Sequence, residues 1–264
     1  GDYNIAIGYN AGTGMTSGIH NTLIGAGAGD ALTTGSYNTV LGYNALSTED
    51  AHGSNTAIGY QALTTLDAGI EGYNVAVGYN AGQDMSTGQR NTFVGTASGA
   101  NLTTGSYNIG IGYEALATEN AHGRNVAIGY QTLKDQDAGV DAYNTAIGYQ
   151  AGASISTGIK NNLIGGLAGD ALTTGSYNVA IGYNALSTED EHGRNIAIGH
   201  NALFSLNAGA DAYNVAIGYD TGWNITTGVN NVLVGGQAGD ALTTGNHNIA
   251  IGRDALSTED AHGY

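Results

Sequence analysis

Histidine and carboxylate side chains occur together in one loop, and the loop recurs at a fixed interval. The cluster is Glu49, Asp50 and His52, and it returns as Glu119, Asn120 and His122, as Glu189, Asp190 and His192, and as Glu259, Asp260 and His262. Oxygen ligands of this kind can bind calcium. However, Asn120 replaces one carboxylate, and the loop lacks the glycine-rich nonapeptide of calcium-binding β-rolls. We therefore interpret the cluster as a solvated acidic loop that protrudes into water, with a calcium site as the alternative.

Catalytic chemistry is not predicted. A catalytic centre needs a nucleophile, a base and an orienting group gathered in a pocket. Here Ser, His and Asp stand at repeated positions, so any combination of them would be copied along the chain. A second acidic set, Asp30, Asp170 and Asp240, is interrupted by Ala100. We expect no enzymatic activity and no cofactor.

Tyrosines and basic residues also follow the repeat. Arg90, Arg124, Lys160 and Arg194 each precede a repeated Asn, and we expect them to bridge to acidic loops on adjacent coils or chains. Tyrosines follow a repeated Gly at Tyr9, Tyr43, Tyr60, Tyr79, Tyr113, Tyr130, Tyr149, Tyr183 and Tyr219. A stripe of tyrosines can bind sugars or form an interface, but stacking within the fold or at a contact between chains is the simpler interpretation.

The elements that position these residues are constrained by composition. The chain has 264 residues with 45 Gly, no Pro, no Cys, and a net charge of −16. Glycine at this frequency disfavours long helices, and the charge argues against binding nucleic acid through its phosphates. No apolar stretch is long enough to span a membrane, so we expect no membrane insertion. The absence of Cys excludes disulfides and leaves the redox compartment open.

The phrase Asn-x-x-aliphatic-Gly recurs through the whole sequence. Its Asn residues are separated by steps of 17, 17, 17 and 19, so that a short repeat is nested in a repeat of 70. They are Asn4, Asn21, Asn38, Asn55, Asn74, Asn91, Asn108, Asn125, Asn144, Asn161, Asn178, Asn195, Asn214, Asn231 and Asn248. We interpret residues 1–264 as a single array with super-repeats 1–70, 71–140, 141–210 and a truncated 211–264.

Each phrase predicts one short strand that cannot bury itself alone. Stacking copies about 4.8 Å apart buries a continuous core, which predicts an all-β parallel β-solenoid of about 15 coils. The aliphatic residue before the Gly is expected to face the core. Asn residues such as Asn4 and Asn21 are expected to form a ladder between coils, and Gly8, Gly25, Gly42 and Gly59 to turn the chain. A closed propeller of four blades is the rival architecture.

The sequences "YNTAIGYQAG" (143–152) and "LTTGSYNVAIGYNAL" (172–186) resemble the repeats of trimeric fibre proteins. Those families are phage tail fibres and the heads of trimeric autotransporter adhesins. The resemblance covers essentially the whole chain, although coils of 17 or 19 residues are longer than those of the adhesins. It implies a homotrimer of three solenoids about one axis, at a cell surface or on a virion. A monomeric solenoid remains the alternative.

Three functions follow from these patterns. The first is a structural and adhesive fibre segment, extracellular or virion-borne, that contacts itself and a host or cell-surface glycan. The second is a periodic surface for a polysaccharide or ice, which the pairs Thr33-Thr34 and Thr173-Thr174 suggest. The third is a self-assembling filament subunit, because the array stops within a phrase and so predicts an excerpt of a longer fibre or an end-to-end contact.

Overall fold

A computed structural model describes residues 2–119 and 121–258. The protein is an all-β parallel β-solenoid in which each coil of about 17 residues contributes one three-residue strand, and the described residues contain no α-helix. None of the described residues forms a helix that could cross a membrane.

The chain divides into two compact units, and each is a stack of coils. The first unit is Gly1–Ile128 with Gly139–Asp141. Its strands are β1 (Ile5–Ile7), β2 (Thr22–Ile24), β3 (Thr39–Leu41), β4 (Thr56–Ile58), β5 (Val75–Val77), β6 (Thr92–Val94), β7 (Ile109–Ile111) and β8 (Val126–Ile128). The second unit is Gly129–Ala138 with Ala142–Tyr264. Its strands are β9 (Thr145–Ile147), β10 (Asn162–Ile164), β11 (Val179–Ile181), β12 (Ile196–Ile198), β13 (Val215–Ile217), β14 (Val232–Val234) and β15 (Ile249–Ile251).

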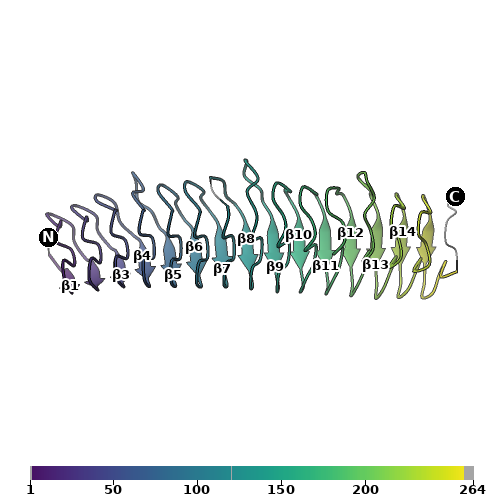
Figure 1. Ribbon diagram of the computed structural model, residues 1–264, viewed down its shortest axis with the longest axis horizontal. Helices are drawn as coiled ribbons and strands as arrows, with labels where there is room; N and C mark the ends of the chain where they lie inside the picture. The colour runs from purple at the N-terminus through teal and green to yellow at the C-terminus, as the bar shows by residue number, and fades with distance from the viewer. Residues whose placement is uncertain (1, 120, 259–264) are drawn as a thin grey trace. The chain divides into compact units, whose positions relative to one another are not determined.

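Within each unit every strand pairs in parallel with the next strand of the sequence, and each repeat phrase aligns with its copy. In the first unit Ile5 pairs with Thr22 and Ala6 with Leu23. In the second unit Val179 pairs with Ile196. Figure 1 shows these strands as successive rungs, and the loops that follow β4 and β12 extend beyond those of their neighbours.

The repeated asparagines form columns of hydrogen bonds inside each unit. The Asn21 backbone N–H donates to Asn4 Oδ1 at 2.8 Å, and the Asn38 N–H donates to Asn21 Oδ1 at 2.9 Å. The Asn21 amide Nδ2 also donates to the carbonyl of Gly35 across its own coil. One buried side chain thus joins two coils and closes a third contact, and the same pattern includes Asn55, Asn74, Asn91, Asn108 and Asn125.

The glycine that ends each strand is required by conformation and by space. Gly8, Gly25, Gly42 and Gly59 have φ between 135° and 147°, a region that L-residues rarely adopt. A Cβ on Gly42 would lie 2.1 Å from the carbonyl oxygen of Gly59 in the next coil. Only a residue without a side chain lets the backbones approach this closely.

The expectation that the aliphatic residue before this glycine faces the core is wrong. Ile7 is 59% and Leu41 47% exposed, whereas the middle residue of nearly every strand is buried, as with Leu23 and Val40. Successive strand residues point to opposite faces, so a three-residue strand places one residue inside and two outside. Turn residues such as Leu32 and Leu46 complete the core.

Large and small side chains alternate in that core. Leu23 of β2 is fully buried, and a Cβ on Gly12 or Gly29 would lie within 3.0 Å of its side chain. Where the turn carries Leu instead, as at Leu46 and Leu63, the strand of that coil has only Val40 or Ala57. The glycine and leucine order of the turns is therefore matched to the volume of the strand residue.

Candidate functional site

The acidic loops, expected to be solvated, are built around a buried glutamate. Glu49, Glu119 and Glu189 are 0% exposed, so the prediction that this residue lies in water is wrong. The position is the one that Leu32 occupies in the preceding coil, eleven residues after a repeated Asn, and the register of the coil directs it inward. The equivalent residues Glu259, Asp260 and His262, together with Asn120, lie outside the described residues.

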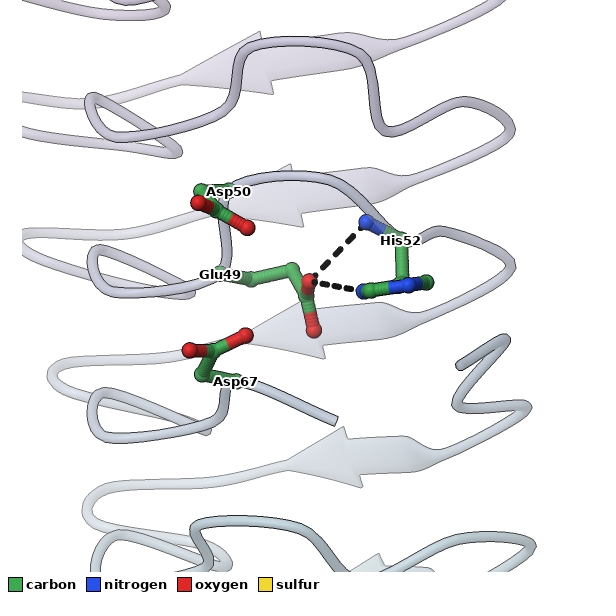
Figure 2. A group of neighbouring side chains, drawn as sticks. All are labelled: Glu49, Asp50, His52 and Asp67. Carbon is green, nitrogen blue, oxygen red and sulfur yellow. Dashed lines mark hydrogen bonds and ion pairs between the residues drawn. The ribbon is translucent and has the colours of Figure 1, made fainter. Parts of the chain in front are cut away.

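The Glu49 carboxylate ties two loops together. Its Oε1 accepts from the His52 backbone N–H at 3.0 Å, and its Oε2 accepts from the Ala68 N–H at 3.1 Å in the next coil. The His52 imidazole Nδ1 lies 3.4 Å from Oε1. Figure 2 shows the carboxylate directed toward His52 and away from Asp50 and Asp67.

The same clamp is formed in the second unit. Glu189 accepts from the N–H groups of His192 and Ala208, and His192 Nδ1 lies 3.6 Å from its Oε1. Burial raises the pKa of both Glu49 and Glu189, and hydrogen bonds from the backbone partly oppose this effect.

The donor set fits a structural clamp better than a metal site. One ligand atom each from Glu49, Asp50, His52 and Asp67 lies within 4.8 Å of the others, and a second such group contains Glu189, Asp190 and His192. Yet both oxygens of each glutamate already accept backbone hydrogen bonds. A calcium ion would have to displace an N–H group that has no other acceptor there, which costs roughly 1–3 kcal/mol.

The tyrosines that follow the repeated glycine stack on one another. Tyr43, Tyr60 and Tyr79 have ring centroids 5.4 and 5.0 Å apart with nearly parallel planes, and Tyr130 stacks on Tyr149 in the second unit. Tyr9 is 79% and Tyr113 43% exposed. Because stacked rings cover one another's faces, the stacked tyrosines offer mainly their edges and hydroxyls to solvent.

A second column, which the sequence analysis noted only for its basic residues, precedes the repeated asparagines. Arg124 and Arg194 form ion pairs of 2.7 Å with Asp141 and Asp211, and these pairs lower the pKa of both aspartates. The expected bridge to an acidic loop is therefore present for these two. Arg90 instead lies over the rings of Tyr73 and Tyr107, and Lys160 lies over Tyr177.

The largest chemical feature that the sequence analysis missed is the outward face of the strands. In each unit this face consists of the two strand residues that flank the buried one, and none of these residues is charged. Exposed members include Ile5, Ile7, Leu41, Ile109 and Ile111 in the first unit, and Ile147, Ile164, Ile196, Ile217 and Val232 in the second. We call these residues the aliphatic face. Strict parity of the strand positions was the signal that could have revealed it.

The described residues contain no pocket, so the chemistry available to this molecule lies on its surfaces. Comparison with protein-family models, with curated proteins and with solved structures finds no match to this chain. The resemblance to trimeric fibre proteins therefore stays a prediction from the sequence.

Proposed function

We propose that this chain is a structural and adhesive segment of a fibre at a cell or virion surface, outside the cell. In this proposal several copies, three by the resemblance, pack through the aliphatic face of each unit. The super-repeat of 70 residues then supplies an equivalent contact surface at regular intervals along the fibre.

The aliphatic face is the observation that carries the proposal. Large contiguous apolar surfaces are rare on monomeric proteins and mark contacts with partners. A chain with a net charge of −16 nevertheless keeps charge off both outward positions of every described strand. Burial of these side chains would be favourable by about 25 cal/mol per Å² of apolar surface.

The partner most compatible with this face is another copy of the same chain. Aliphatic columns that repeat at the strand spacing match an identical set of columns in register, whereas an unrelated partner would need to reproduce that spacing. The buried core inside each coil is also thin, and association compensates for a small interior.

Sedimentation equilibrium of the whole chain tests the assembly. We expect a mass that is a multiple of 26.6 kDa, with a trimer by the resemblance. Replacing Ile164 and Ile217 by Lys should release monomers, because lysine ammonium groups would be desolvated in the contact. The matched control replaces Thr34, an exposed loop residue, by Lys and should leave the mass unchanged. A wild-type chain that sediments as a monomer would contradict the proposal.

A second candidate, a periodic surface for ice, uses the same face. Thr22, Thr39 and Thr56 align in one outward column beside Ile24 and Ile58. The two functions exclude each other, since a face buried between copies cannot meet a crystal. A monomer that inhibits ice recrystallisation, and loses this activity on Thr39→Lys, would favour the second candidate. The Thr33 and Thr34 hydroxyls considered earlier donate to carbonyls of the next coil instead.

A further inference from the structure

One turn of the second unit departs from the repeat at several adjacent positions. In the coils of β12 and β13, aromatic residues stand nine positions after the repeated Asn, at Phe204 and Trp223. The same position in the corresponding coils carries small, polar or basic residues: Thr13, Thr64, Gln83, Lys134 and Ala153. His200 also replaces a tyrosine and Asp220 replaces an amide residue, as comparison with Tyr60, Tyr130, Asn80 and Gln150 shows.

The two aromatic residues lie in directly adjacent coils. The Ser205 N–H donates to the Trp223 carbonyl at 3.2 Å, which aligns the two turns. The rings lie 6.5 Å apart at 72°, an edge-to-face arrangement. Trp223 is 41% exposed, and its partner meets it edge to face. The stacked tyrosine columns differ, because each of their rings covers the next.

Polar groups beside this pair are held in place by a nearly buried carboxylate. Asp220 accepts a hydrogen bond from Asn201 Nδ2 at 3.0 Å and lies 3.6 Å from His200 Nδ1. The imidazole is itself sandwiched between Tyr183 and Tyr219 and keeps 45% of its side chain exposed. Its Nε2, on the opposite side of the ring from Asp220, is therefore a positioned hydrogen-bonding group.

We infer that the turns bearing His200, Phe204, Asp220 and Trp223 form a binding site for a neutral glycan. Flat aromatic side chains combine an apolar face with a polar edge, and the apolar C–H face of a pyranose ring is complementary to an indole face. A few fixed polar groups then give orientation, here His200 and the exposed amide of Asn224, while Asp220 positions His200. The net charge of −16 disfavours acidic sugars.

This inference rests on the proposed role in surface attachment, and it names the class of ligand that one part of the fibre would contact. The two proposals fail separately. Sedimentation mass tests the assembly, whereas the glycan site is tested by a signal from one residue.

Trp223 is the only tryptophan of the chain, so its emission reports on this turn alone. We would titrate the whole protein with maltohexaose, cellotetraose and chitotetraose up to about 10 mM, well above a dissociation constant of ~1 mM. At least one should produce a saturable change in emission, and polygalacturonate should produce none. The absence of a saturable change with all three neutral oligosaccharides would overturn the inference.

The variants restore residues that other coils already carry, so they are compatible with the fold. Phe204→Thr follows Thr64, and Asp220→Asn follows Asn80; each should weaken binding about tenfold or more. For Trp223→Ala, which follows Ala153, binding is measured by calorimetry and should be lost. The matched control is Lys134→Thr, at the position equivalent to Phe204, and should bind as the wild type does. Undiminished binding by the three variants, or a reduced sedimentation mass that marks the pair as a contact between copies, would overturn the glycan site.

Discussion

The carboxylate of Glu49 accepts a hydrogen bond at 3.1 Å from the backbone N–H of Ala68, which lies 19 residues further along the chain. The same carboxylate holds the His52 N–H of its own loop. A charged side chain thus occupies a core position because it supplies two acceptors to loops that have no regular hydrogen-bond ladder. The glutamate clamp fixes the loop at a cost in desolvation, and that cost makes stability depend on pH.

The first prediction concerns pH. Burial raises the pKa of Glu49 and Glu189 above the ordinary 4.5. Stability from such a group is complete below 4.5 and is lost as pH rises through the raised value. We expect the melting temperature to increase on acidification from neutral pH toward 4.5. Below 3.8 it should fall, because the lowered pKa values of Asp141 and Asp211 have the opposite effect.

Replacing Glu49 and Glu189 by Gln isolates this contribution. Glutamine keeps an acceptor of the same size without a titratable charge, so the increase on acidification should be smaller than in the wild type. Relief of charge repulsion is common to both proteins and cancels in the comparison. Melting curves recorded by circular dichroism across the pH range provide the measurement, and identical pH profiles would contradict the role assigned to the clamp.

The second prediction concerns the glycine at the strand end. Gly42→Ala should destabilise the first unit by about 3 kcal/mol or more, because it combines an unfavourable φ with a clash against backbone. The Gly42 φ is 147°, and the added Cβ would lie 2.1 Å from the Gly59 oxygen. Urea unfolding measures the change.

Gly236→Ala is the matched control. Gly236 has no positive φ, and its nearest contact would be the Tyr219 oxygen at an ordinary 3.9 Å. Alanine there should be neutral or stabilising by about 0.4–1 kcal/mol through the unfolded chain. Equal effects of the two substitutions would show that close stacking of the backbone is not what requires glycine.

The third prediction concerns the asparagine columns. Asn91 is fully buried; its Oδ1 accepts from the Asn108 N–H at 2.8 Å, and its Nδ2 donates to the Gly105 carbonyl at 2.9 Å. Asn91→Ala leaves both partners unsatisfied and should cost about 2–5 kcal/mol. Asn101→Ala, at an exposed position, should change the free energy of unfolding by less than about 0.5 kcal/mol. A similar small effect at Asn91 would contradict the ladder as a source of stability.

How far the sequence predicts this fold depends on the kind of residue. The stacked coils follow from spacing alone, because an Asn and a Gly at a constant offset can be satisfied only by in-register copies. The direction in which Ile7 points was wrongly inferred from its hydrophobicity, since alternation fixes that neighbours differ but not which neighbour faces inward. Glu49 was wrongly placed in water because its polarity was weighed above its register, which it shares with Leu32.

The candidate sites were less accessible to sequence analysis for a related reason. The recurring tyrosines could be found as a column, but whether Tyr60 offers its face or covers Tyr79 depends on side-chain packing. The turn with Phe204 and Trp223 was visible only as a departure from the repeat, and an analysis of what recurs passes over what does not. Its polar partners, Asp220 and His200, are brought together by the stacking of two coils.

The last prediction concerns a local rearrangement of the core. Phe93 of β6 occupies the position that Leu163 has in β10, and it fills space that its neighbour in β7 leaves free. That neighbour is Gly110, where a Cβ would lie 2.7 Å from Ser98 Oγ and 3.0 Å from the Phe93 ring. Ser98 also donates from Oγ to the Gly110 carbonyl at 2.8 Å. The three residues form a set that replaces the second unit's fully buried Leu163, Ala168 and Ala180.

Gly110→Ala alone should overpack this region and destabilise the protein by about 1–3 kcal/mol. Phe93→Leu alone should also destabilise it, because a cavity remains beside Gly110. The triple variant Phe93→Leu, Ser98→Ala and Gly110→Ala reproduces the arrangement of the second unit, so its stability should lie within about 1 kcal/mol of the wild type. Urea unfolding of the single and triple variants gives the coupling between the positions. Additive losses would mean that each coil packs independently of the next, because only mutual filling of one space produces the expected recovery.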